Sequence, residues 1–270
     1  MDRFSIRNNL SNIQNINGCS PATRRRLWQV FAKQYILGNK TPTVKYDIVE
    51  DILSYFGKEY EYNMNPFDHR NNCNILRSFI WDTCEWYKVY DFVEYHIRNN
   101  PETIYDYNEI LNDEKTGFHI IDKKVTPITN TAEIAMIEEA LERSPQHVAE
   151  SLSKALTLFS SREKPDYNNT IKECITAVEA LACTIVDGSE ETCGKAISKF
   201  SEYGIELNEH LEVAIKSLYK YTCNEDGKRH GGTTYVESDI EDAKFMIITC
   251  SAIVNFLVVK WEKAKNNSSD

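Results

Sequence analysis

Turn-forming residues and short cysteine pairs are scarce in this 270-residue sequence. It contains ten glycines and seven prolines, and so few turn formers favour long helices over a turn-rich β fold. None of its eight cysteines forms a C-x-x-C pair or another zinc-binding spacing. Phosphate-binding glycine-rich loops, G-x-S-x-G motifs and H-E-x-x-H motifs are also missing. We therefore expect neither a metal nor a cofactor.

A secretory signal and long apolar runs are missing as well. The first residues, MDRFSIRNNL, are not a signal peptide, and we find no apolar run near the ~18 residues of a membrane span. The net charge of −10 argues against binding nucleic acid or an anionic membrane through bulk positive charge, although a local basic site stays open. Cysteines such as Cys174 and Cys250 lie among apolar residues, as buried thiols do in a reducing compartment. These features predict a cytoplasmic protein with no membrane partner.

The composition is that of a folded, mainly α protein. Hydrophobic residues make up 41% of the chain and charged residues 27%, which suffices for a buried core. Apolar residues recur at helical spacing, except in the segment 117–128, where short apolar pieces flank Asp122–Lys124 as in a small β-hairpin. In the first half, helices are predicted over residues 21–37, 44–56, 72–98 and 102–112.

The second half predicts an up-and-down helical bundle, because short connections favour antiparallel neighbouring helices. Asn130 with Glu133, and Ser144 with Pro145, have the pattern of helix starts. Helices are predicted over residues 145–160, 166–187, 192–203, 208–222 and 238–265. The apolar face of the last helix is predicted to comprise Phe245, Ile248, Ala252, Phe256 and Val259.

The chain length fits one large domain or two ordinary ones, at ~150 residues per domain. We place the boundary near residue 145. The prediction is a helix-rich N-terminal domain with one hairpin at 1–144, a helical bundle at 145–265, and a disordered tail at 266–270.

The segment Asn224–Gly232 holds the strongest candidate for chemistry, because it places an arginine beside a histidine in a polar, glycine-flanked loop before a long helix. Arg229 can hold a phosphate with two hydrogen bonds, and His230 can exchange a proton near neutral pH. Lys228 is a candidate phosphate contact. The alternative is that Arg229 pairs with a nearby carboxylate and that His230 caps the following helix.

Two residues of the helix predicted over 166–187 are candidate supports for this loop. Glu179 lies next to the apolar stripe and could orient Arg229, or could be a solvated surface acid. Asn168 could face the same cleft as this loop, or could belong to an ordinary helix start.

Three further clusters have a structural explanation as well as a functional one. The basic run Arg24–Arg26 could contact nucleic acid, but a charge run on a helix is usually a solvated face. His69 and Cys73 have the i, i+4 spacing of metal ligands and lack a third ligand nearby. Trp81, with the aromatic residues that follow it, has the spacing of a helix core, and a base-stacking platform is the alternative.

The second half resembles a HEPN domain, a helical bundle frequent in prokaryotic conflict systems. The resemblance lies in residues 165–173 (PDYNNTIKE), 177–181 (AVEAL), 218–222 (LYKYT) and 227–230 (GKRH), and in the final helix at 243–246 and 251–257. The first half resembles the N-terminal domain of AbiJ-type abortive-infection proteins. That resemblance lies in residues 3–5 (RFS), 25–28 (RRLW), 86–94 (WYKVYDFVE) and 128–130 (ITN).

The resemblance implies a phage-defence protein that cuts RNA without a metal, as a homodimer through the C-terminal bundle. Active HEPN proteins use an arginine, a polar residue, a short spacer and a histidine, with two copies facing each other. Arg229 and His230 match the first two positions, and Thr233, Thr234 and Tyr235 stand where the final histidine is expected. The alternative is a catalytically inactive HEPN module that binds RNA or a protein partner and dimerises. The N-terminal domain is expected to sense, regulate or bind a protein or phage trigger.

Overall fold

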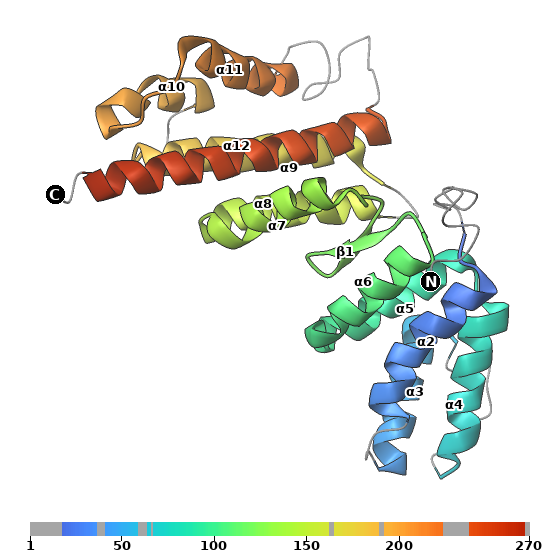
Figure 1. Ribbon diagram of the computed structural model, residues 1–270. Helices are drawn as coiled ribbons and strands as arrows, with labels where there is room; N and C mark the ends of the chain where they lie inside the picture. Colours follow the sequence, from blue (N-terminus) through green and yellow to red (C-terminus); the bar gives the residue numbers. More distant parts are fainter. Residues whose placement is uncertain are drawn as a thin grey trace, which may run out of the picture. The chain divides into compact units, whose positions relative to one another are not determined.

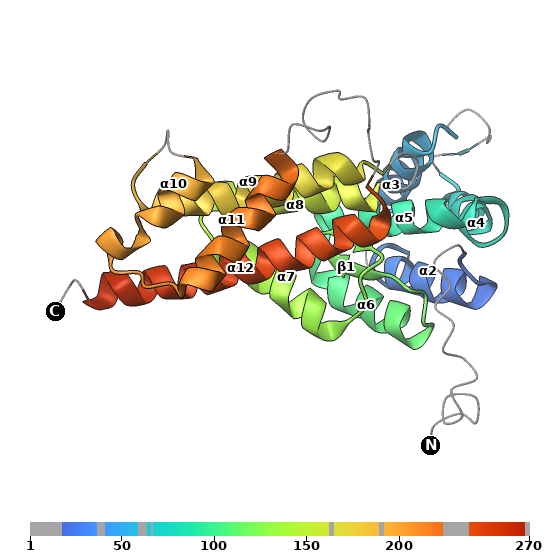
Figure 2. The same ribbon diagram turned by 90° about the horizontal axis from the view of Figure 1, so that it is seen from above.

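The protein is described by a computed structural model over residues 18–36, 41–58, 64–65, 67–161, 165–188, 192–223 and 238–267. Helices dominate these ranges, which contain one small two-stranded sheet (Figures 1 and 2). The prediction of a mainly α protein is confirmed. Contacts between residues divide the chain into two compact units, Met1–Pro127 and Ile128–Asp270.

The first unit contains five α-helices, two short helical turns and a hairpin within the described residues. Two helices begin with a capping hydroxyl followed by proline: Ser20 Oγ accepts from Thr23 N at 3.0 Å, and Thr41 Oγ1 accepts from Val44 N at 3.4 Å. The elements are α2 (Pro21–Tyr35), α3 (Pro42–Tyr55), α4 (His69–Ser78), the π-helical turn η1 (Phe79–Thr83), α5 (Trp86–Asn99), the 3-10 turn η2 (Pro101–Thr103), α6 (Ile104–Asp113), β1 (His119–Ile121) and β2 (Lys124–Thr126).

The core of the first unit is rich in aromatic side chains. Phe31 lies 5.1 Å from Trp28 and 5.2 Å from Phe92, measured between ring centroids. All three rings are buried, and they join α2 to α5. Aromatic pairs at such tilted geometries add stability beyond the area that they bury.

The single helix predicted over 72–98 is wrong, because the chain breaks between η1 and α5. Cys84 has an extended backbone, with φ −74° and ψ 153°. Arg24 of α2 donates to the carbonyl oxygen of Ile80 at 2.8 Å and to Cys84 Sγ at 3.4 Å. A side chain from another helix thus occupies a carbonyl at the point where the regular helix stops, a contact that local periodicity does not reveal.

The hairpin predicted within 117–128 is confirmed. Its strands pair antiparallel with Ile120 opposite Val125, and the two turn residues, Asp122 and Lys123, have φ angles of 48° and 60°. Positive φ at both turn positions is typical of a two-residue hairpin turn. Asn108 of α6 fixes the edge of β1, since it donates to the Ile120 oxygen and accepts from the Ile120 nitrogen.

The second unit is all-helical in its described residues. The helices of its centre pack as α7 on α8, α8 on α9, and α12 on α7, α8 and α9. Figure 1 shows α10 and α11 on the other side of the α9–α12 pair from α7 and α8. The elements are α7 (Thr131–Arg143), α8 (Gln146–Ser160), α9 (Tyr167–Ile185), α10 (Cys193–Ser198), the 3-10 turn η3 (Phe200–Tyr203), α11 (Glu209–Cys223) and α12 (Ile240–Asn267).

The predicted starts of these helices are confirmed in part. Asn130 caps α7, because its Oδ1 accepts from the nitrogens of Ala132 and Glu133. The side chain of Ser144 does not cap α8, which begins after Pro145 with no side-chain cap. Its hydroxyl is buried and lacks a hydrogen-bond partner among the described residues.

The predicted apolar face of α12 is wrong. Phe245 is 59% exposed, and Ile248, Ala252, Phe256 and Val259 are only partly buried. Because α12 is apolar around much of its circumference, periodicity alone could not select the side that packs against the bundle. The buried side instead comprises Ala243, Met246, Ile247, Cys250, Val254, Leu257 and Val258.

The compact units differ from the predicted domains at one helix. α7 falls inside the predicted first domain of 1–144, yet it packs on α8 and α12. At the other end, α12 continues to Asn267, so two residues of the predicted disordered tail are helical.

Among the described helices, α12 is long and apolar enough to cross a membrane by length and composition. Its most apolar window has a mean hydropathy of 1.7, and half of that window is buried inside the unit. The core helix of a soluble protein passes the same test. The finding is therefore weak evidence for a membrane span.

Candidate site on one face of α9

Helix α9 carries both described candidate residues on one face. Asn168 and Glu179 lie eleven residues apart, which is three turns at 3.6 residues per turn. The helix begins at the N-cap Asp166, whose Oδ1 accepts from the nitrogen of Asn169 at 3.0 Å. The adjoining face is buried as predicted, through Ile171, Cys174, Ile175, Val178, Leu181 and Ile185.

Glu179 joins α9 to α11 and to the start of α10. Its Oε1 accepts from the hydroxyl of Tyr219 at 2.9 Å and from the nitrogen of Cys193 at 3.3 Å. The side chain is half-buried. A carboxylate held by a hydroxyl and a backbone N–H is oriented by the fold.

Asn168 joins the other end of α9 to the chain that enters α12. Its Oδ1 accepts from the nitrogen of Ser238 at 3.3 Å. Tyr219 precedes the segment 224–237 and Ser238 follows it, so one helix face holds both flanks of this segment. Arg229, His230 and Lys228 lie outside the described residues, and the predicted contact of Glu179 with Arg229 stays a prediction.

A groove between α11 and α12 opens beside these flanks. Its volume is about 440 Å³, and Tyr221, Asp242 and Phe245 are among the residues that line it. The other lining side chains are small or apolar: Ala214, Ser217, Leu218 and Met246. Lys172 of α9 and Lys220 of α11 are exposed, so this unit offers cations for a phosphate backbone as well as an apolar groove.

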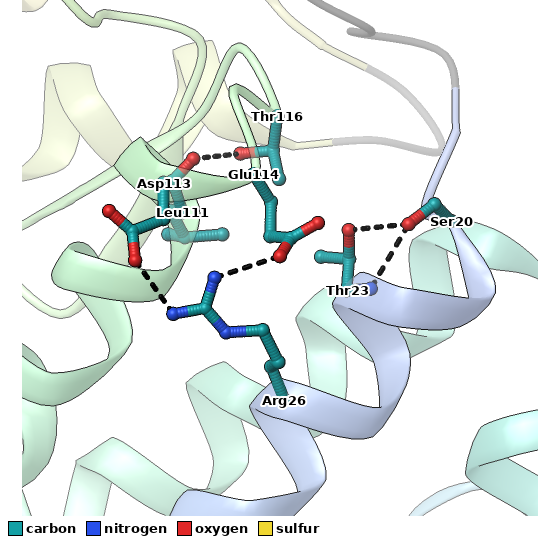
Figure 3. Close-up of polar contacts among 7 residues, drawn as sticks. All are labelled: Ser20, Thr23, Arg26, Leu111, Asp113, Glu114 and Thr116. Carbon is teal, nitrogen blue, oxygen red and sulfur yellow. Dashed lines mark hydrogen bonds and ion pairs between the residues drawn. The ribbon is translucent and has the colours of Figure 1, made fainter. Parts of the chain in front are cut away.

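The basic run Arg24–Arg26 is largely structural. Arg26 points from α2 to the end of α6, where it pairs with Asp113 at 2.7 Å and Glu114 at 2.8 Å (Figure 3). Hydrogen bonds to these two carboxylates raise the pKa of Arg26. Since Arg24 binds the Ile80 carbonyl, only Arg25 of the three keeps its guanidinium at an exposed position, over the Trp81 ring.

The sequence analysis missed two features of the first unit. One is a buried polar cluster around His96, which bonds Tyr107 and Gln34. The other is a groove between α2 and α4 that is lined by Arg70 and Arg77. The seven-residue spacing of these arginines places them on one face of α4, a signal that could have indicated a cationic helix face but not the groove beside it.

The fold defines a helical protein of two units, with a polar face on α9 of the second unit. The first half identifies its family: residues 2–143 match the model of AbiJ N-terminal domain 4, and the chain belongs to that family. This domain associates the chain with abortive infection, a form of phage defence. No curated protein and no solved structure matches the chain.

The family match ends at the last residue of α7. It therefore includes a helix that packs within the second compact unit, whose first residue is Ile128. The predicted boundary near residue 145 stays a prediction, because the family match and the packing divide the chain at different places.

Proposed function

We propose that this protein is a phage-defence effector whose C-terminal HEPN-like bundle cuts RNA without a metal. One observation carries the proposal: a single face of α9 binds both flanks of the segment that contains Arg229 and His230. Both ends of this segment are therefore held on one side of the bundle. Positioning of reacting groups accounts for a large part of the rate of many enzymes.

The chemistry would be an attack of the ribose 2′-OH on the adjacent phosphorus. His230 would take the proton of the 2′-OH or give a proton to the leaving 5′ oxygen, and Arg229 would stabilise the charge that develops on the phosphate. Lys228 would bind a neighbouring phosphate. The products would be a 2′,3′-cyclic phosphate and a 5′-hydroxyl.

The proposal requires a homodimer, because one imidazole per chain cannot serve as base and acid in the same step. The side of α12 that faces away from the bundle core carries a partly exposed apolar stripe, which comprises Phe245, Ile248, Ala252, Phe256 and Val259. With Phe245 at 59% exposure, this stripe supports self-association of the second unit. Two copies would bring two arginine–histidine pairs to one strand. The N-terminal domain would bind the protein or phage component that triggers cleavage, in the cytoplasm.

The experiment is digestion of total RNA by the full-length protein, with and without EDTA. We expect EDTA-resistant fragments with cyclic phosphate ends, and an Arg229→Ala/His230→Ala protein that leaves RNA intact. The control Arg143→Ala/His147→Ala removes the same two residue types from α7 and α8 and should cut normally. Full activity of the Arg229/His230 variant, with its fold verified by circular dichroism, contradicts the assignment of the site.

The second candidate function is a catalytically inactive module that binds RNA or a protein partner. Thr233, Thr234 and Tyr235 stand where the motif of active relatives has its histidine, and this observation favours it. Such a module leaves RNA intact and gives a gel shift that weakens with salt. A purely regulatory protein gives neither fragments nor a shift.

A further inference from the structure

The first unit contains a surface groove between α2 and α4 that no part of the proposed nuclease uses. Its volume is about 320 Å³, within the ~300–1,000 Å³ of small-molecule sites. Trp28, Ala32 and Ile36 contribute the α2 side, at the spacing of one helix face. Cys73 contributes a buried side chain from α4. The floor of the groove is therefore apolar.

The polar side of the groove is cationic. Arg70 and Arg77 supply the positive charge from α4, where His69 and Asn74 also line the groove, and both arginines are exposed. Among the residues that the structure describes, no carboxylate lines the groove. In the part of the chain that the structure describes, neither Arg70 nor Arg77 has an ion pair, whereas Arg26 of the same unit has two.

A tryptophan restrains one of these arginines beside the groove. The guanidinium carbon of Arg77 lies 5.1 Å from the ring centroid of Trp81, and that of Arg25 lies 5.6 Å from it. Stacking uses the flat face of a guanidinium and leaves its N–H groups free to donate at the edge. Trp81 lies in η1, and π-helical turns are frequent at functional sites.

The two arginines favour an anionic ligand, and the apolar floor favours a ligand that contains a flat ring. Arginine forks match the oxygens of a phosphate with two hydrogen bonds, and an apolar floor favours a flat, weakly polar group such as a nucleobase. A metal ion fits poorly, because burial raises the pKa of the Cys73 thiol, with the positive charge of Lys45 opposing. A protonated thiol is a weak metal ligand.

From this geometry we infer that the groove binds a free nucleotide, with the phosphates on Arg70 and Arg77 and the base over the apolar floor. The inference does not depend on the proposed nuclease. In a defence protein, such a site would allow the first domain to respond to a nucleotide. A longer RNA strand is the less suitable ligand, because the cationic side chains cluster at one short groove and do not form a track.

The test is calorimetric titration of the full-length protein with ATP, AMP, adenosine and a short single-stranded RNA. We expect ATP or AMP to bind, and adenosine to bind at least ~10-fold more weakly, because it lacks the phosphate. An Arg70→Gln/Arg77→Gln protein should lose at least ~10-fold in nucleotide affinity. Both arginines are exposed, so this variant should fold normally.

The matched control is Arg98→Gln. Arg98 is also exposed and lies 6.0 Å over the ring of Tyr55, but it does not line the groove. This variant should bind nucleotide as the unmodified protein does. Two outcomes overturn the inference: no binding of either nucleotide at about 5 mM, a concentration that detects millimolar affinity, or equal affinity in the groove variant and the unmodified protein. Binding of the RNA without binding of ATP or AMP also overturns the inference.

Discussion

At the scale of single residues, the imidazole of His96 is held on both sides in the core of the first unit. It is 3% exposed and lies 2.7 Å from the Tyr107 hydroxyl, through Nδ1, and 2.8 Å from Gln34 Oε1, through Nε2. The amide nitrogen of Gln34 donates to Asn100 Oδ1, so its oxygen must accept from His96 Nε2. Nδ1 then accepts from Tyr107. In the neutral ring, these partners place the proton on Nε2.

We predict that stability falls as the pH drops from about 6.5 to about 4. Burial lowers the pKa of His96 from 6.5 to about 4. Between these values the unfolded chain binds a proton that the folded protein does not bind, and the free energy of unfolding therefore decreases with decreasing pH. At ~1.4 kcal/mol per pKa unit, the loss is up to about 3 kcal/mol.

The measurement is urea unfolding across this pH range for the unmodified protein and for His96→Gln. The variant should be less stable at pH 7 and should depend less on pH. His210→Gln, which removes an exposed imidazole from α11, should follow the unmodified protein. Parallel pH profiles of His96→Gln and the unmodified protein would rule out this role for His96.

At the scale of elements, α9 is the helix that joins the other helices of the second unit. It contacts α8, α10, α11 and α12, and its polar face holds the flanks of the candidate loop. Its first turn depends on Asp166, whose Oδ2 also accepts from the side-chain nitrogen of Asn169 at 2.7 Å. A change at this cap should therefore affect the whole bundle.

We predict that Asp166→Ala lowers the free energy of unfolding of the second unit by ~1 kcal/mol, the usual loss for a removed N-cap. Asp166→Asn keeps an acceptor oxygen and should cost only a few tenths of that amount. The measurement is the urea midpoint at constant slope. Equal midpoints for Asp166→Ala and the unmodified protein would show that this cap does not limit the stability of the bundle.

At the scale of the whole molecule, the negative charge is concentrated in the second half. The first unit has 16 Lys and Arg against 17 Asp and Glu, and the second has 15 against 24. The net negative charge of the second unit therefore repels an RNA strand, which can bind only through local clusters of cationic side chains. The affinity of this unit for RNA should weaken steeply with salt.

We predict that the full-length protein is a dimer and that Phe245→Lys makes it monomeric. Phe245 is 59% exposed on the apolar stripe of α12, so a charge there should disrupt an interface without unfolding the bundle. Light scattering after size-exclusion chromatography measures both states.

The control for this prediction is Phe67→Lys, because Phe67 is 90% exposed in the first unit. This variant should remain dimeric. A monomeric unmodified protein at ~10 μM would contradict the prediction, since stable dimers form well below that concentration. Protein that floats with lipid vesicles would instead assign the stripe to a membrane.

Much of the fold could be predicted from the sequence, because local chemistry specifies local structure. Proline after a capping hydroxyl begins α2 and α3, Asp166 begins α9, and the turn residues Asp122 and Lys123 form the hairpin. The candidate site could be predicted less well. Asn168 and Glu179 lie on one helix face because helical periodicity places them there, but their partners Ser238 and Tyr219 come from other elements.

The sequence alone determined the helical class, the family and the positions of most helix starts, because these depend on the residues within a few turns. Only the tertiary structure decided the break at Cys84, the buried side of α12 and the groove between α2 and α4. Each of these depends on contacts with a distant part of the chain: Arg24 at the Ile80 carbonyl, α9 against α12, and the α2 side chains that line the groove with those of α4. Such contacts lie beyond the reach of local periodicity, which cannot choose between two apolar faces of one helix.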